Sequence, residues 1–85
     1  MALTGEQLRA ARALLRWEQK QLAEASGVSL ETIKRLEKMA GPIGGLARTS
    51  DAIQAALEAA GVAFISAGAY QGEGGPGVRF KESAG

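Results

Sequence analysis

The chain contains neither cysteine nor histidine among its 85 residues. Without cysteine it forms no disulfide bonds and no thiolate metal sites, so we expect a reducing, cytoplasmic environment. Without histidine it lacks the commonest general base and metal ligand. Serine and lysine are present, but no base and orienting group accompany them in a catalytic pattern. We therefore expect no enzyme activity, no cofactor and no metal site.

Long hydrophobic runs are also missing. The most apolar stretch, residues 59–70, contains two glycines and a serine and is shorter than the ~18 residues that a membrane span requires. The first residues, MALTGEQLR, lack the basic and then apolar pattern of a signal peptide. We expect a soluble protein of one domain that does not bind membranes. A chain of this size buries only about 60–65% of its unfolded surface, which favours help from a partner chain.

The net charge of +1 is too small by itself to indicate a nucleic-acid partner. Its distribution is more informative. Residues 1–48 contain eight Lys/Arg and five Asp/Glu, whereas residues 49–85 contain two and four. The basic excess therefore lies in the first half of the chain, as expected for a surface that binds phosphates. The excess is modest, so we expect DNA binding to need more than one subunit.

Residues 19–37, QKQLAEASGVSLETIKRLE, predict two short helices joined by a tight turn. Gly27 can take the left-handed conformation that such a turn needs. Ser29 is expected to cap the second helix, and Ser26 to bond back to the carbonyl of Leu22. Apolar residues at helical spacing form the inner face: Leu22, Val28, Ile33 and Leu36. This is the helix-turn-helix pattern, whose second helix is built to lie in a DNA major groove.

Three short motifs make the pattern specific: Gln19-x-x-Leu22-Ala23, Gly27-Val28-Ser29, and Thr32-Ile33 leading to Glu37. With these motifs, residues 8–37 resemble the lambda-repressor-like, Cro-type helix-turn-helix domain of the XRE family of bacterial and phage regulators. The resemblance implies a mostly α fold, a four-helix domain over roughly the first sixty residues. It also implies an ion pair between Arg12 and Glu37 that braces the first helix against the end of the third. Glu18 departs from the family pattern, which has Ser, Thr or Asn capping the second helix.

At about 100° per residue, the second helix of the motif, at about 29–38, turns one arc of polar side chains outward. On an arbitrary helix such an arc is most often a solvated face, but behind this signature DNA recognition is the better interpretation. The resemblance implies that four residues approach base edges: Ser29, Leu30, Glu31 and Arg35. Arg35 suits guanine, Glu31 the cytosine amino group and Leu30 the thymine methyl group. The resemblance also implies a phosphate clamp at Gln19, supported by Thr32, Lys34 and Lys20.

Two more helices are expected around this motif. Thr4 and Gln7 have the spacing of a capping box for a first helix that ends near residue 15 or 16. Trp17 follows this helix and is expected to cover the core. Thr49 or Ser50 is expected to cap a fourth helix, which stops at Gly61.

The last part of the chain changes in character. Residues 62–66 are β-branched and aromatic, and residues 78–81 alternate apolar with basic side chains, which predicts a β-hairpin around a glycine-rich loop. We divide the chain into a helix-turn-helix domain, 1–61, and a hairpin tail, 62–85. Unprotected strand edges tend to pair with another chain, so the tail is the expected dimerisation element. The residues expected at the interface are Val62, Phe64, Ile65, Val78 and Phe80.

The loop of this hairpin matches a dinucleotide-binding fingerprint, Gly72-x-Gly74-x-x-Gly77. That fingerprint works only between a strand and a helix, with an acidic residue ~20 positions later. Here it leads into a strand near the end of the sequence, so we interpret it as a loop.

We therefore expect a sequence-specific transcriptional regulator that binds double-stranded DNA as a homodimer on a palindromic site. One alternative is a protein-interaction module, such as an antitoxin or regulatory adaptor that binds a partner protein through its tail. A co-purifying partner would distinguish that alternative. A small nucleotide-binding enzyme is a further alternative, which a test of nucleotide binding would exclude.

Overall fold

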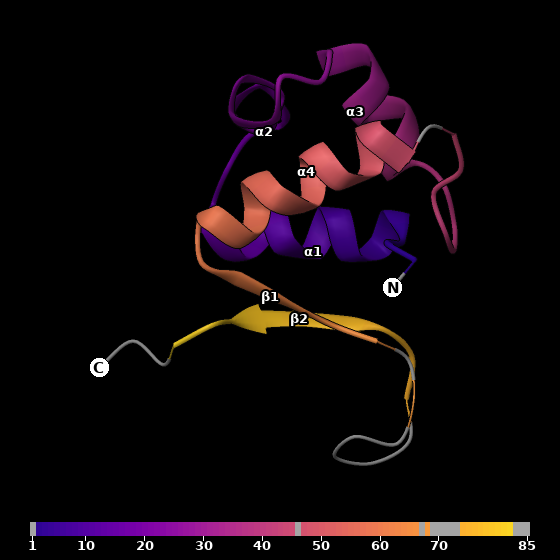
Figure 1. Cartoon of the computed structure of the whole chain (residues 1–85), viewed down its shortest axis with the longest axis vertical. Coiled ribbons are helices and arrows are strands. Elements are labelled where there is room, and N and C mark those ends of the chain that lie inside the picture. The colour runs from indigo at the N-terminus through magenta and orange to yellow at the C-terminus, as the bar shows by residue number, and fades with distance from the viewer. Residues whose placement is uncertain (1, 46, 67, 69–73, 83–85) are drawn as a thin grey trace.

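The computed structural model describes residues 2–45, 47–66, 68 and 74–82. Within these ranges the chain forms four helices and one antiparallel two-stranded sheet (Figure 1). The helices are α1 (Gly5–Leu15), α2 (Gln19–Ser26), α3 (Leu30–Glu37) and α4 (Ala47–Ala59), and the strands are β1 (Val62–Ile65) and β2 (Gly77–Phe80). The predicted fold, a mostly α domain with a C-terminal β-hairpin, is confirmed.

Helix α1 begins with the predicted capping box. The Thr4 hydroxyl accepts the backbone N–H of Gln7 at 3.0 Å, and the Gln7 side-chain oxygen accepts the backbone N–H of Thr4 at 3.0 Å. Two backbone donors at the start of the helix are thereby satisfied. The helix ends at Arg16, which adopts a left-handed conformation with φ of 56°. This conformation is costly for a residue with a side chain and turns the chain toward α2.

The turn between α2 and α3 forms as predicted. Gly27 is left-handed, with φ of 75°. The Ser26 hydroxyl donates to the carbonyl of Leu22 at 2.7 Å and accepts the N–H of Val28 at 3.2 Å. Ser29 caps α3, since its hydroxyl accepts the N–H of Thr32 at 3.2 Å. The side-chain oxygen of Ser26 therefore holds the last turn of α2 and the start of the connection at once.

All four helices and β1 contribute side chains to one core. Its fully buried members are Leu3, Leu8, Ala11, Leu22, Ile33, Leu36, Ile53, Leu57 and Val62. Trp17 is half-buried and packs against this cluster, as the sequence predicts. Helix α4 packs against α2 and β1, while the hairpin covers the opposite side of α1 from α2 and α3 (Figure 1).

Helix α4 begins at Ala47, so the prediction that Thr49 or Ser50 caps it is wrong. Both residues lie inside the first turns of the helix and are half-buried. The physical reason is that Ala47 and Arg48 are good helix formers, so the helix extends back past the two polar residues. Gly61 does end this segment, with φ of 109°.

The chain before α1 pairs with the loop after α3. Thr4 and Pro42 form an antiparallel bridge, with hydrogen bonds from Gly5 N to Gly41 O at 3.1 Å and from Ile43 N to Leu3 O at 2.9 Å. Gly5 lies against the C-terminal end of α3. A Cβ atom at Gly5 would lie 2.2 Å from the carbonyl oxygen of Met39 and 2.8 Å from that of Leu36. Only glycine permits this approach of two backbones.

The two strands pair in a regular register, from Val62 opposite Phe80 to Ile65 opposite Gly77. Because side chains alternate along a strand, Val62 and Phe64 share one face. Both pack on the helical core, and Val62 is fully buried. The dinucleotide-like motif in the loop begins at Gly72, which lies outside the described residues, while Gly74 and Gly77 belong to the hairpin. The segment that follows this motif is a strand, which agrees with the loop interpretation.

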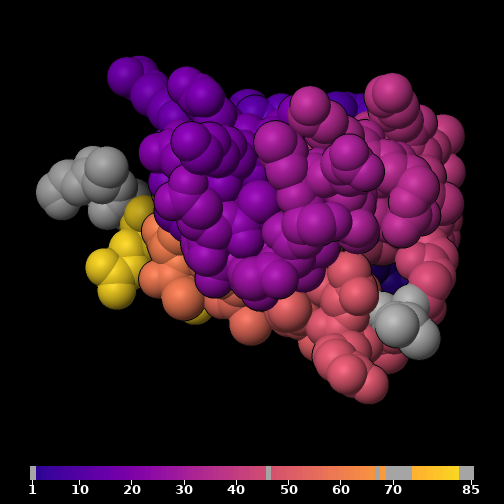
Figure 2. Space-filling view, turned by 90° about the horizontal axis from the view of Figure 1, so that it is seen from above, coloured from indigo at the N-terminus to yellow at the C-terminus, as the bar shows by residue number. Residues whose placement is uncertain are grey.

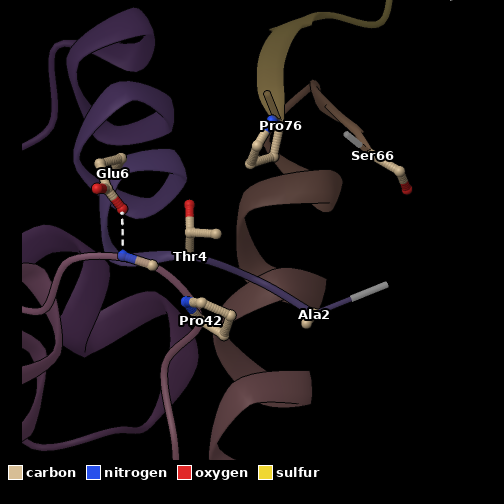
Figure 3. A pocket seen from close by; sticks show the side chains of 7 residues that line it. Ala2, Thr4, Glu6, Pro42, Ser66 and Pro76 are labelled. Atoms are coloured by element: carbon tan, nitrogen blue, oxygen red, sulfur yellow. Dashed lines mark hydrogen bonds between the residues drawn. The ribbon is translucent and has the colours of Figure 1, made fainter. Parts of the chain in front are cut away.

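A hollow of about 570 Å³ lies where the segment before α1, the loop after α3 and the ends of the hairpin meet (Figure 3). It is lined by Ala2, Thr4, Glu6, Gly41, Pro42, Ser66 and Pro76. Glu6 is the one charged residue of these seven, and its carboxylate accepts the N–H of Gly41 at 2.9 Å. That hydrogen bond lowers the pKa of Glu6. In the described part of the chain, no helix is long and apolar enough to cross a membrane.

The close contact at Gly5 yields a stability prediction. Gly5→Ala forces a methyl group against two backbone carbonyls, so we expect a loss of about 1–3 kcal/mol in the free energy of unfolding. Gly44→Ala is the matched control, because a Cβ there meets nothing within 4 Å. Urea denaturation of both variants measures the effect. Equal midpoints for Gly5→Ala and the wild-type chain would contradict the close packing of α1 on α3.

Candidate nucleic-acid interface

Helices α2 and α3 together form one face of the molecule, on the side away from the hairpin (Figure 1). Figure 2 looks directly onto this face. Helix α3, with its caps Ser29 and Lys38, spans the expected recognition helix. Its inner side carries Ile33 and Leu36, both buried in the core. Its outer side carries exposed Glu31, Lys34 and Arg35. The helix therefore presents one charged arc outward and is anchored by its apolar arc.

The four candidate base-reading residues differ in accessibility. Ser29, Glu31 and Arg35 are exposed, whereas Leu30 is half-buried. The Ser29 hydroxyl donates to the Thr32 hydroxyl at 2.8 Å while it caps the helix. Glu31 lies in the first turn of α3, and Arg35 in the last. The negative charge of Glu31 and the positive charge of Arg35 each interact favourably with the helix dipole at their end of α3. The exposed charged side chains therefore also stabilise α3.

The C-terminal end of α3 is held by a cluster around the carboxylate of Glu37, which is 4% exposed. Arg12 of α1 binds it with two nitrogens, at 2.8 Å and 3.0 Å. The amide of Gln19 donates to the same carboxylate at 3.1 Å. Arg12 also donates to the carbonyl of Trp17 at 2.8 Å. This cluster ties together α1, the α1–α2 connection, the start of α2 and the end of α3.

The electrostatics of this pair follow from its geometry. The hydrogen bonds to Glu37 raise the pKa of Arg12 above its ordinary value, so the guanidinium stays charged. A two-nitrogen contact between arginine and a carboxylate is among the strongest hydrogen-bonded arrangements in proteins. Because the Glu37 side chain is nearly inaccessible to water, these donors replace the hydrogen bonds that water would make to it. The pair that the resemblance implies is therefore present as a partly buried, hydrogen-bonded brace.

Sequence reasoning did not identify Arg9 as part of this brace. Its guanidinium donates to the backbone carbonyl of Glu37. Gly5, Arg9 and Arg12 recur at spacings of four and three along α1, so they lie on one face of that helix. All three meet the end of α3. The sequence shows that these three residues share one face of the helix, but it does not show that this face contacts the end of α3.

Gln19, Lys20 and Lys34, three of the residues expected to contact phosphate, lie around the start of α2, whereas Thr32 lies beside Ser29 on α3. Lys20 and Lys34 are exposed, whereas Gln19 and Thr32 are half-buried. A shallow hollow of about 360 Å³ lies here, lined by Arg12, Glu18, Gln19, Lys20, Leu30 and Lys34. In this structure the Gln19 amide is engaged with Glu37. The hollow thus joins the helix N-terminus of α2 to two lysines, an arrangement suited to anions.

Most of the residues expected at a dimer interface lie on the face of the sheet that packs on the helices, since Val62 pairs with Phe80 and Phe64 with Val78. Val62 is fully buried in its own chain, so the expectation that its side chain contacts a second copy is wrong. It is buried because β1 follows α4 directly and its first side chain packs beneath the helices. Phe64 and Val78 are half-buried against the same core. Ile65 is half-buried, and Phe80 is 45% exposed, the largest exposure of a large hydrophobic side chain in the described residues.

Comparison with known protein families agrees with this geometry. A family model described as helix-turn-helix, of the lambda-repressor/Cro-like type, matches residues 8–43. Residues 8–43 therefore match the XRE family of helix-turn-helix proteins. The match extends from α1 through α2 and α3 to the loop that pairs with the segment before α1. The family is one of DNA-binding transcription regulators and is not an enzyme family. A search of curated proteins returned no match to the chain.

The brace at Glu37 yields a second prediction. Glu37→Ala leaves Arg12 without its partner in a partly buried position, so we expect a loss of about 3 kcal/mol in the free energy of unfolding. Glu24→Ala removes an exposed carboxylate from α2 and should change stability by less than about 0.5 kcal/mol. Chemical denaturation compares the two. A Glu37→Ala midpoint equal to that of Glu24→Ala would show that the brace contributes nothing.

Proposed function

We propose that this XRE-family domain is a sequence-specific transcriptional regulator that binds a palindromic DNA site as a homodimer. The observation that carries the proposal is the outward arc of α3, which is charged, exposed and held at its C-terminal end by α1. A helix in a major groove must keep a fixed orientation while only its outer side chains contact bases. The brace around Glu37 supplies that fixed orientation.

The proposed contacts divide into two kinds. Arg35 and Glu31 read base edges, since arginine pairs with guanine through two hydrogen bonds and glutamate accepts from the cytosine amino group. Ser29 and Leu30 approach the bases at the start of the helix. Gln19, Lys20, Thr32 and Lys34 contact phosphates, which fix the register of the protein on the duplex but specify no sequence.

The hairpin is the proposed dimer interface. It lies across α1 from α2 and α3 (Figure 1), so a second copy bound there leaves the α2–α3 face uncovered. Phe80 supplies an exposed apolar side chain, and a lone two-stranded sheet gains stability from additional strands. A dimer also doubles a basic excess that is small on one chain. In such a dimer the two copies of α3 contact half-sites about 34 Å apart, or a multiple of that distance.

DNA recognition by α3 is tested by comparing two neighbouring side chains. Arg35→Ala should weaken binding to the preferred duplex by about 1–3 kcal/mol and relax the preference at one base position. Lys34→Ala should weaken binding to preferred and scrambled duplexes equally, because it removes a phosphate contact. Titrations of both duplexes by fluorescence anisotropy measure this. Equal losses on both duplexes for Arg35→Ala would mean that Arg35 contacts only phosphate.

The dimer interface is tested by placing one charge at two sites. Phe80→Glu should convert the dimer to a monomer, because it inserts a charge into an apolar contact. Ala10→Glu adds the same charge to the exposed face of α1 and should leave the dimer intact. Light scattering after size exclusion gives both masses. A dimer that survives Phe80→Glu but not Ala10→Glu would move the interface to the helices, and a co-purified second protein would favour the interaction-module alternative. Truncation at Gly61 is a poorer test, because it removes the buried Val62.

A further inference from the structure

One buried side chain joins the hairpin to the helix-turn-helix domain. Gln7 of α1 is 1% exposed. Its amide nitrogen donates to the carbonyl of Ile65 at 3.2 Å and to the carbonyl of Gly77 at 3.0 Å. Ile65 and Gly77 are paired residues on the two strands. The same amide group thus holds both strands at the point where the regular hairpin ends.

The chemistry of this joint requires a carboxamide. The oxygen of the Gln7 amide accepts the N–H of Thr4 in the capping box, while its nitrogen supplies the donors for the two strand carbonyls. Glutamine offers one acceptor and two donors at its tip, whereas an ionised glutamate offers acceptors alone. A carboxylate at this position preserves the cap but faces two carbonyl oxygens without a proton to share. Gln7→Glu therefore removes the hydrogen bonds to the strands while it keeps the capping hydrogen bond.

The position of Gln7 on α1 connects the hairpin to the recognition helix. Gln7 lies between Gly5 and Arg9, and both of these residues contact the end of α3. One helix, α1, thus holds β1 and β2 through Gln7 and the end of α3 through its neighbours. The orientation of the sheet relative to α3 is therefore set partly across the width of this helix and partly by the packing of β1 against α4.

We propose that Gln7 is a positioning residue that sets the spacing between the two half-sites that the dimer recognises. The inference rests on the proposed homodimer. If two hairpins meet at the twofold axis, the separation of the two copies of α3 depends on how each hairpin is attached to α1. One added base pair moves a half-site by about 3.4 Å and rotates it by about 35° around the DNA axis. A hairpin rigidly attached to α1 keeps the two copies of α3 at a fixed separation, so binding to the altered site is weaker. A loosely attached hairpin lets the two copies adjust to the altered site.

The experiment uses the full chain and DNA duplexes that the wild-type protein selects from a random-sequence pool. The selected site is then altered by inserting or deleting one base pair at its centre, and the affinities are compared by titration. We expect the wild-type protein to lose about tenfold in affinity for each change, equivalent to about 1.4 kcal/mol. For Gln7→Glu we expect the loss to fall below about threefold, with binding to an isolated half-site unchanged.

Gln21→Glu is the matched control. Gln21 accepts the N–H of Glu18 at 2.7 Å at the start of α2, the same capping role as Gln7, but it is exposed. It should keep the wild-type spacing preference. Gln7→Met, which removes the two donors and the cap acceptor without adding a charge, is the second variant if Gln7→Glu does not fold, with the isolated half-site as its check on the fold.

The outcomes separate this inference from the proposed function. A wild-type protein that is monomeric, or that selects sites without twofold symmetry, overturns the proposed homodimer and the inference with it. A dimeric wild-type protein whose folded Gln7 variants keep the tenfold spacing penalty overturns the inference alone. Equal losses on the isolated half-site and on the full site would show that Gln7 only supports the fold, which also overturns it.

Discussion

The carboxylate of Glu37 is the point on which the presentation of the recognition helix depends. A nearly inaccessible charge must be met by donors, because its loss of hydration is costly. Arg12 and Gln19 supply three nitrogens to the two oxygens of Glu37. These donors come from α1 and α2, while the acceptor ends α3. One charged group thus requires three helices to keep their places at once.

The rest of the architecture follows from the row of residues on α1 that meets α3. Gly5 permits backbone contact, and Arg9 holds the last carbonyl of α3. The opposite side of α1 carries the sheet, which Gln7 attaches. Helix α1 is therefore the element to which the α2–α3 end and the hairpin end are both attached. A small chain with a limited core gains order from such polar joints, because hydrophobic packing alone specifies orientation poorly.

Much of this structure could be predicted from the sequence where the signals are local. The caps at Thr4 and Ser29 depend on residues three positions apart, and the turn depends on the conformational freedom of Gly27. The resemblance to a known family added the long-range pair between Arg12 and Glu37. The contacts of Gln7 with both strands had no local signal, since they cross 58 and 70 positions of the chain.

The sequence was misleading where a local preference competed with packing. Thr49 and Ser50 are good capping residues, yet the helix begins before them at Ala47. Val62 belongs to an apolar strand, a pattern that predicts contact with a partner, but its place directly after α4 buries it. The left-handed Arg16 at the end of α1 is a similar case, because arginine gives no signal for that conformation. Tertiary packing decides each of these positions.

Amide hydrogen exchange under native conditions tests the central claim most directly. If α1 and the Glu37 cluster hold α3 in place, the amides of Ile33, Leu36 and Glu37 open only when the whole domain unfolds. Their opening free energies should then equal those of the slowest amides in α1. A value lower by about 2 kcal/mol or more would mean that α3 opens separately. That result would contradict an account in which the recognition helix is rigidly presented by α1.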